Sequence, residues 1–222
     1  MKKKITIGLL LAIFLIPVSL SQTVKIAAIP YTLHFENAPM DYKILGDNHL
    51  SITAPENTDL FISPDGYYKI NKSPRLIFRP DSDFILTAKI TVDFHTKWDA
   101  GVLMLYNDPQ HFAKFCLEKD FKGQTRVVSV VCNETADDCN SMSVENNEIY
   151  YRVIGSTRNK SFGLFYSLDN KSWFPIRNFK LDRIDNLQIG FSAQSPVGKG
   201  CSADFSDINL QQRKPLDWWQ GN

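Results

Sequence analysis

The stretch DFILTAKITVDF, from Asp83 to Phe94, decides the fold class of this chain. Its even-numbered positions are all apolar, and its odd-numbered positions are polar or charged with the single exception of Ile85. Side chains of a β-strand point alternately to opposite faces, so a period of two predicts a strand with one buried and one wetted face. The stretch therefore predicts an amphipathic strand in a layered β-protein.

Nine further segments resemble this strand and are separated by turn-forming residues such as Ser63-Pro64-Asp65-Gly66. They are Ser51–Thr53, Leu76–Arg79, Ala100–Tyr106, Phe112–Glu118, Thr125–Val131, Ile149–Ile154, Phe162–Ser167, Leu187–Ala193 and Ser202–Leu210. No stretch shows helical periodicity over three turns. We expect an all-β, two-sheet antiparallel jelly-roll sandwich. It would occupy residues 22–210 as a single domain, followed by a C-terminal tail over residues 211–222.

The first 21 residues predict a secretory signal peptide. Lys2, Lys3 and Lys4 precede the apolar run Ile5–Val18, and small residues follow at Ser19-Leu20-Ser21. Cleavage is expected between Ser21 and Gln22, which would place the mature chain in the periplasm or outside the cell. An uncleaved membrane anchor is the alternative. No later apolar run is long enough to span a membrane.

The charge of the mature chain argues against nucleic acid as a partner. Of the 25 basic residues, three precede the expected cleavage site, leaving 22 against 24 acidic residues and a net charge of −2. Binding to the phosphate backbone needs a basic face that displaces counterions. The well-mixed charges provide no such face.

Four cysteines would enter an oxidising compartment. Cys132 and Cys139 bracket the polar segment NETADD, and we expect them to form a disulfide. A metal site is the alternative reading, but the spacing matches no zinc motif and no histidine is close in sequence. Whether Cys116 and Cys201 pair with each other stays open.

The segment Phe112–Glu118 places a cation and a carboxylate on one strand face. Lys114 and Glu118 alternate with Ala113, Phe115 and Leu117, which we expect to point into the core. Trp98-Asp99 precedes the neighbouring strand, and Arg152 lies on a later one. If Trp98, Asp99, Lys114, Glu118 and Arg152 share a concave sheet face, they form a polar patch with aromatic walls. Such a patch suits a hydroxylated or anionic small ligand. A solvated face with weak cross-strand ion pairs is the alternative.

A catalytic interpretation rests on Glu118-Lys119-Asp120. A glycoside hydrolase needs one carboxylic acid and a second carboxylate, here Glu118 with Asp99 or Asp120. The next alternate position is Lys122 instead of a third acid, which weakens this interpretation. The four histidines are scattered, and no nucleophile elbow or phosphate-binding glycine loop is present. We therefore expect no catalytic residues, no metal and no cofactor.

Two aromatic features outside this strand have structural and functional interpretations. The segment YSLDNKSW, from Tyr166 to Trp173, predicts a tight hairpin turning at Asp169-Asn170. Trp218-Trp219 in the tail is expected to cover a sheet edge, with an aromatic sugar platform as the alternative.

The order of several short motifs resembles a known family. They are Asn37-Ala-Pro39, Thr58-Asp59-Leu-Phe61, Asp83-Phe84-x-Leu86, Asp99-Ala-Gly-Val-Leu-Met104, Lys114-x-x-x-Glu118, Ser129-Val-Val131, the YSLDNKSW hairpin and Gly190-Phe-Ser-Ala-Gln-Ser-Pro196. Together they are similar to the domain of unknown function 1349, related to the fungal "regulation of enolase" protein. The resemblance covers about Leu33 to Leu210.

This resemblance implies a concanavalin A-like lectin/glucanase sandwich similar to domains attached to bacterial glycosidases. The family's recurring polar positions fall here on Asp99, Lys114, Glu118 and Arg152. Two positions depart from its pattern: Ser-Asp-Trp is replaced by Asp137-Asp138-Cys139, and Asp-Gly of the hairpin by Asp169-Asn170. The first departure removes an aromatic side chain near the expected groove.

These observations lead to three hypotheses for function. The first is a secreted or periplasmic, non-catalytic carbohydrate-binding domain. The second is a glycoside hydrolase or lyase with Glu118 as acid, and the third is a structural or protein-interaction sandwich.

Overall fold

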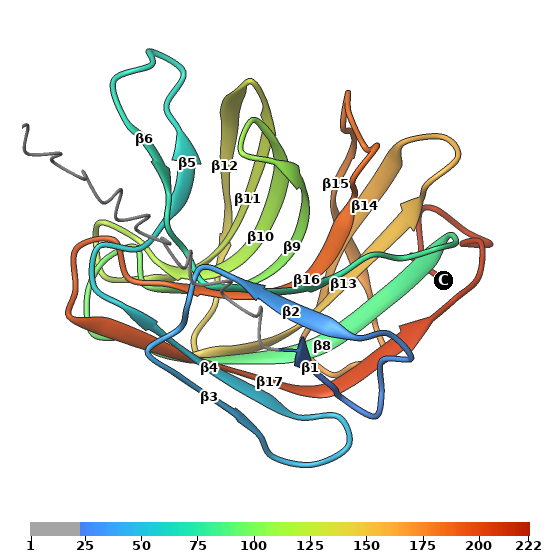
Figure 1. Cartoon of the computed structure of the whole chain (residues 1–222), viewed down its shortest axis with the longest axis horizontal. Coiled ribbons are helices and arrows are strands. Elements are labelled where there is room, and N and C mark those ends of the chain that lie inside the picture. The colour runs from blue at the N-terminus through green and yellow to red at the C-terminus, as the bar shows by residue number, and fades with distance from the viewer. Residues whose placement is uncertain (1–22) are drawn as a thin grey trace, which may run out of the picture.

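Alternating apolar and polar residues become antiparallel strands throughout the part of the chain that the computed structural model describes, residues 23–222 (Figure 1). The expected signal peptide lies outside these residues and stays a prediction, as do the domain limits. The described residues contain strands and no helix, and therefore no helix that could cross a membrane.

The strands form two large sheets and one small hairpin, and all neighbours pair antiparallel. The eight-stranded sheet has the order β1 (Thr23–Val24), β2 (Leu33–Glu36), β7 (Arg75–Phe78), β16 (Gln188–Gln194), β9 (Ala100–Asp108), β10 (His111–Lys119), β11 (Thr125–Asn133), β12 (Thr135–Ser143). The seven-stranded sheet has the order β15 (Phe174–Lys180), β14 (Ser161–Ser167), β13 (Glu148–Ser156), β8 (Phe84–Asp93), β17 (Gly200–Gln211), β4 (Leu50–Pro55), β3 (Asp41–Ile44). The hairpin pairs β5 (Leu60–Ile62) with β6 (Lys69–Asn71). The predicted two-sheet antiparallel sandwich is confirmed.

The main core lies between the two large sheets, where each contributes its inward-facing row. Leu86, Ala88, Ile90 and Val92 of β8 are buried there, as the alternation of the opening stretch predicted. From the opposite sheet, Phe115 stacks on Tyr151 with ring centroids 3.7 Å apart. Ala113, Leu117 and Val153 share this core, so the predicted inward faces of β10 and β13 are confirmed.

Ile85, the exception in the opening stretch, has a partner on the outer face of the seven-stranded sheet. It forms a small buried cluster with Ile154 and Phe165, against which Trp173 and Trp218 pack. An apolar residue on a nominally wetted face is therefore covered by the hairpin and the C-terminal tail. Trp218 covers this sheet face rather than a sheet edge.

A second apolar cluster lies on the outer face of the eight-stranded sheet. Leu60 and Ile62 of β5 pack there on Met104, Phe112 and Val130. In Figure 1 the β5–β6 hairpin stands beside the upturned strands β9 to β12, and β5 contacts β12. Burial of the hairpin's apolar side holds it against this face and leaves a hollow next to it.

The strands that the sequence did not predict are mostly short or lie at sheet edges. The longest is β12, which contains most of the NETADD segment and whose side chains are largely exposed. β3 and β15 are also edge strands with mostly exposed residues. An edge strand that buries neither face needs no apolar alternation, so the pattern that reveals central strands is missing.

The predicted disulfide between Cys132 and Cys139 is wrong. NETADD forms the turn of the β11–β12 hairpin and the first half of β12. In this hairpin Cys132 pairs with Ala136, while Cys139 pairs with Ser129. The two cysteines are therefore three residues apart along the ladder, roughly 10 Å, and point to opposite faces. All four cysteines are free: Cys132 is buried and Cys139 exposed, and Cys116 and Cys201 are buried in different apolar clusters.

Candidate functional site

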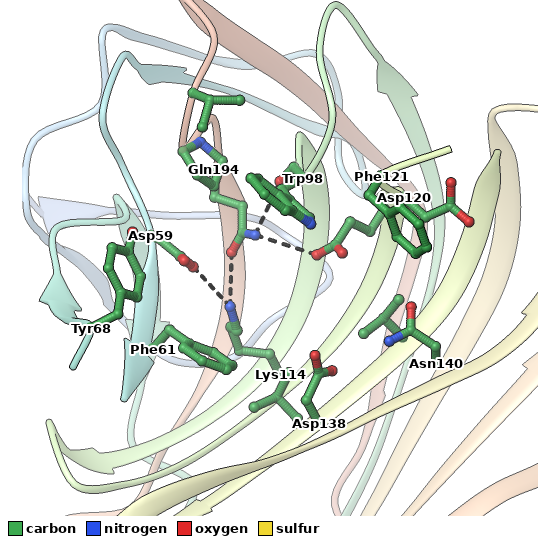
Figure 2. Close-up of a pocket in the computed structure, with 15 residues that line it drawn as sticks. Asp59, Phe61, Tyr68, Trp98, Lys114, Asp120, Phe121, Asp138, Asn140 and Gln194 are labelled. Atoms are coloured by element: carbon green, nitrogen blue, oxygen red, sulfur yellow. Dashed lines mark hydrogen bonds and ion pairs between the residues drawn. The ribbon is translucent and has the colours of Figure 1, made fainter. Parts of the chain in front are cut away.

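A pocket of about 600 Å³ opens on the outer face of the eight-stranded sheet, beside the β5–β6 hairpin (Figure 2). Strands β10, β11 and β12 form its floor, and loops before β9 and after β16 complete its walls. Its lining combines aromatic side chains with several charged and amide groups. The lining residues are Asp59, Phe61, Tyr68, Trp98, Lys114, Glu118, Asp120, Phe121, Val128, Val130, Asp138, Asn140, Gln194, Pro196 and Val197.

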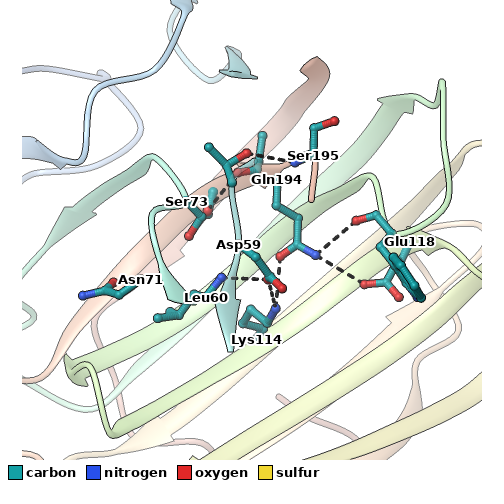
Figure 3. Close-up of polar contacts among 12 residues, drawn as sticks. Asp59, Leu60, Asn71, Ser73, Lys114, Glu118, Gln194 and Ser195 are labelled. Atoms are coloured by element: carbon teal, nitrogen blue, oxygen red, sulfur yellow. Dashed lines mark hydrogen bonds and ion pairs between the residues drawn. The ribbon is translucent and has the colours of Figure 1, made fainter. Parts of the chain in front are cut away.

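Lys114 is the centre of the polar network in this pocket (Figure 3). Its Nζ lies 2.9 Å from Oδ1 of Asp59 and donates to Oε1 of Gln194 at 3.0 Å. The Lys114 side chain is only 5% exposed and that of Asp59 11%, so the ion pair is largely withdrawn from water. Burial alone lowers the pKa of Lys114, but the neighbouring acidic groups, chiefly Asp59 with its hydrogen bond and also Glu118, together outweigh it and raise that pKa above its usual value. Lys114 is therefore charged and already paired.

Asp59 is held in place by the backbone at the start of the hairpin. The amide of Leu60 donates to its Oδ1 at 2.7 Å, and its carbonyl accepts from the amides of Lys72 and Ser73. Immediately before it, the amide of Thr58 donates to the carbonyl of Ser195. These bonds join the hairpin to Ser195, which directly follows Gln194, the last residue of β16.

Glu118 lies at the other end of this network. Nε2 of Gln194 donates to the carbonyl of Trp98 at 3.2 Å and lies 3.5 Å from Oε2 of Glu118. Burial raises the pKa of Glu118 to about 8; Lys114 opposes this effect, and neighbouring carboxylates including Asp138 add to it. Burial likewise raises the pKa of Asp138. The pocket therefore contains acidic groups that lack a matching cation.

Trp98 lines the pocket from a strained backbone position. Its φ is 66°, a left-handed conformation that bulky side chains rarely adopt. Its amide donates to the carbonyl of Lys119, and its side chain is partly exposed at the pocket mouth. Strain of this kind persists only where surrounding contacts impose it.

Asp99 supplies those contacts and does not line the pocket. Its carboxylate accepts from the amides of His95 and Thr96 and from the hydroxyl of Ser195 at 2.7 Å, and the residue is fully buried. Asp99 therefore fixes the turn that presents Trp98. Asp99 was expected to bind a ligand, but the structure places it behind the pocket lining, where it positions Trp98.

Neither predicted catalytic partner of Glu118 is free to act. Asp99 is fully engaged, and Asp120 accepts from Nε of Arg126 at 3.0 Å and from the amides of Lys122 and Gln124. Of the other pocket carboxylates, Asp59 is paired with Lys114, and Asp138 lies two strands away from Glu118 and four positions along the ladder, since it faces Lys114 across Val130. That offset puts the Glu118 and Asp138 Cα atoms roughly 16 Å apart.

Arg152 is not part of this pocket, and its predicted placement with Lys114 is wrong. β13 belongs to the seven-stranded sheet, where Arg152 pairs with Thr87 and points to the outer face. Its guanidinium stacks over the ring of Trp173 at 3.8 Å and donates to the carbonyl of Gly221 at 3.0 Å. Alternation assigned the correct face of β13, but the strand lies in the other sheet.

Of the residues expected at the ligand site, Trp98, Lys114 and Glu118 line the pocket, and several other lining residues were not predicted. Asp59 and Gln194 both occur in the short motifs that carry the family resemblance, which was the available signal. Asp138 occupies one of the positions that depart from the family pattern. Cys139, next to it, does not line the pocket, so the missing aromatic side chain there removes no pocket wall.

Among residues 23–222, no three His, Cys, Asp or Glu side chains come together in a group that could hold a metal ion.

Solved structures with the same fold were found at low sequence identity. A functionally unknown protein from Saccharomyces cerevisiae superimposes with a TM-score of 0.74 and 19% identity, covering 82% of this chain and 96% of that one. The GH43 protein BlXynB from Bacillus licheniformis matches with a TM-score of 0.63 and 12% identity, covering 82% of this chain and 37% of that one. An engineered GH43 glycoside hydrolase gives the same score and identity over 95% of this chain and 42% of that one.

This chain therefore spans less than half the length of those two GH43 proteins. No curated protein matches its sequence. A family model described as "Protein of unknown function (DUF1349)" matches residues 35–213, which is most of the chain and contains every pocket residue named above. The chain belongs to the DUF1349 family.

Proposed function

We propose that this protein is an exported, non-catalytic carbohydrate-binding domain, and that the pocket beside the β5–β6 hairpin is its ligand site. One observation carries the proposal: the pocket has aromatic walls around a few polar groups fixed by hydrogen bonds. Phe61, Tyr68, Trp98 and Phe121 provide the walls, and Lys114 and Gln194 hold each other in place. Ligand sites are typically concave and largely apolar, with a few oriented polar groups.

The geometry supports binding better than hydrolysis. Glu118 has the raised pKa of a general acid, but its predicted carboxylate partners are held in turns. One GH43 neighbour is described as a glycoside hydrolase, and at 12% identity it supports the fold rather than the activity.

A glycan panel applied to the chain beginning at residue 22 tests the proposal. We expect at least one neutral or charged oligosaccharide to bind, and Trp98→Ala to weaken it about tenfold through loss of an aromatic contact. Trp219→Ala is the matched control, because Trp219 lies in the tail and is 74% exposed. Absence of binding across polysaccharides and oligosaccharides contradicts the proposal, as does equal weakening by both substitutions.

A further inference from the structure

The charges lining the pocket are strongly unbalanced. Four carboxyl groups, from Asp59, Glu118, Asp120 and Asp138, face a single amine, that of Lys114. Lys114 is paired with Asp59 at 2.9 Å, and Asp120 with Arg126 at 3.0 Å. Glu118 and Asp138 are left without a cation.

These two carboxyl groups also lack hydrogen-bond donors. The one contact of Glu118 in the described chain is the 3.5 Å approach of Gln194 Nε2, which is at the limit of a hydrogen bond. Asp138 accepts no hydrogen bond from any described residue, and its neighbour in the pocket, Asn140, makes none either. Asp138 is exposed to water, whereas Glu118 is largely buried. A buried carboxyl group without a strong donor or a counter-charge is unfavourable, so the lining around Glu118 is suited to a ligand that brings both.

The donors already present do not suit an anion. The amine of Lys114 is paired with the carboxylate of Asp59, and the amide of Gln194 donates to the carbonyl of Trp98. A uronic acid or a sulfated sugar would bring a further negative charge beside Glu118 and Asp138. The expectation of an anionic ligand, which depended on Arg152, loses its basis because Arg152 lies on the other sheet.

We propose, resting on the carbohydrate-binding function, that the ligand is an amino sugar with a free, protonated amine facing Glu118, while the exposed Asp138 adds negative charge farther along the pocket. An ammonium group offers three donors and no acceptor, which matches the unfilled acceptors of the pocket. Its hydrogen bonds to carboxylates are charge-assisted and stronger than neutral ones. The aromatic walls contact the apolar face of the sugar ring, and acetylation of the amine removes the group that the carboxylates recognise.

The ionisation of Glu118 gives a second signature of this binding mode. Burial is the main cause of its raised pKa, and among the charged groups around it the carboxylates of Asp138, Asp59 and Asp120 outnumber the one cation, Lys114. An arriving ammonium restores the balance and lowers the pKa of Glu118, so binding near neutral pH releases a proton. A neutral sugar releases none.

The test compares glucosamine tetrasaccharide, its fully N-acetylated counterpart and a galacturonic acid tetrasaccharide by titration calorimetry, at a pH where the amine is protonated. We expect the free amine to bind at least tenfold more tightly than the acetylated form, with no binding of the galacturonic acid. Repeating the titration in buffers of different ionisation enthalpy measures the proton release. Glu118→Gln should reduce the preference at least fivefold and abolish the proton release, and Asp138→Asn, which removes a more distant charge, should reduce the preference less. Glu145→Gln, at an exposed turn, is the control for general surface attraction.

The outcomes separate this inference from the function on which it rests. Equal affinity for the amine and acetylated forms, or tighter binding of the galacturonic acid, overturns the amino-sugar proposal and leaves carbohydrate binding standing. A preference that survives in both pocket variants, or that Glu145→Gln reduces equally, also overturns it, because the attraction then comes from overall charge. Failure to bind any member of the wider glycan panel removes the proposed function itself.

Discussion

Substitution of Lys114 by Met should destabilise the protein by about 3–5 kcal/mol, the range observed when one partner of a buried ion pair is removed. Met retains most of the length of the lysine stem, so the change removes charge and hydrogen bonds rather than packing. Asp59, 11% exposed, then loses its counter-ion and keeps only the amide of Leu60 as a close donor. Gln194 loses a charge-assisted partner as well. An exposed lysine on a sheet face would give a much smaller effect.

A double-mutant cycle isolates the contribution of the pair. Asp59→Asn keeps an acceptor for the amide of Leu60 while removing the charge, so the Lys114→Met/Asp59→Asn protein should recover about 2 kcal/mol relative to the sum of the single changes. Urea unfolding monitored by tryptophan fluorescence gives each free energy by linear extrapolation. Lys199→Met is the control, because Lys199 and Glu56 form an ion pair of similar length, 2.8 Å, at the exposed surface. We expect no measurable change in the free energy of unfolding.

Two results would refute this reasoning. A loss below about 1 kcal/mol for Lys114→Met would mean that water screens the pair as it does at a surface. A cycle that is additive within about 0.5 kcal/mol would mean that the two side chains do not depend on each other.

Three further predictions follow from the same structure. The folded pKa of Glu118 is raised to about 8, so its contribution to the free energy of unfolding falls as pH rises from about 4 to 8. The Glu118→Gln variant should therefore gain thermal stability relative to wild type at pH 8 compared with pH 5. Parallel pH profiles of the two proteins would contradict this. Arg152→Ala should cost about 0.5–2 kcal/mol through lost stacking on Trp173, while leaving glycan affinity unchanged in titrations; weakened binding would place Arg152 in the site. Unreduced, denatured protein should react with iodoacetamide at all four cysteines, and a mass corresponding to two would restore a disulfide.

The sequence by itself determined the fold class and the direction of many side chains. A period of two assigns each residue to one face of its strand whatever the strand's neighbours are. That is why the inward positions of β8, the burial of Phe115 and the shared outer face of Lys114 and Glu118 were all predictable from local pattern. The departure of Asp169-Asn170 from Asp-Gly was equally local, and Asn170 adopts the positive φ that the turn needs.

The tertiary structure alone decided which faces meet. Lys114 pairs with Asp59, 55 residues earlier, and with Gln194, 80 residues later, because β5 packs on the outer face of the sheet and β16 runs beside β9. Strand order and register are set by burial summed over whole sheets, and no periodicity within one strand encodes them. For the same reason Arg152 had the right face but the wrong sheet, and Cys132 and Cys139, close in sequence, are separated by the register of β11 and β12.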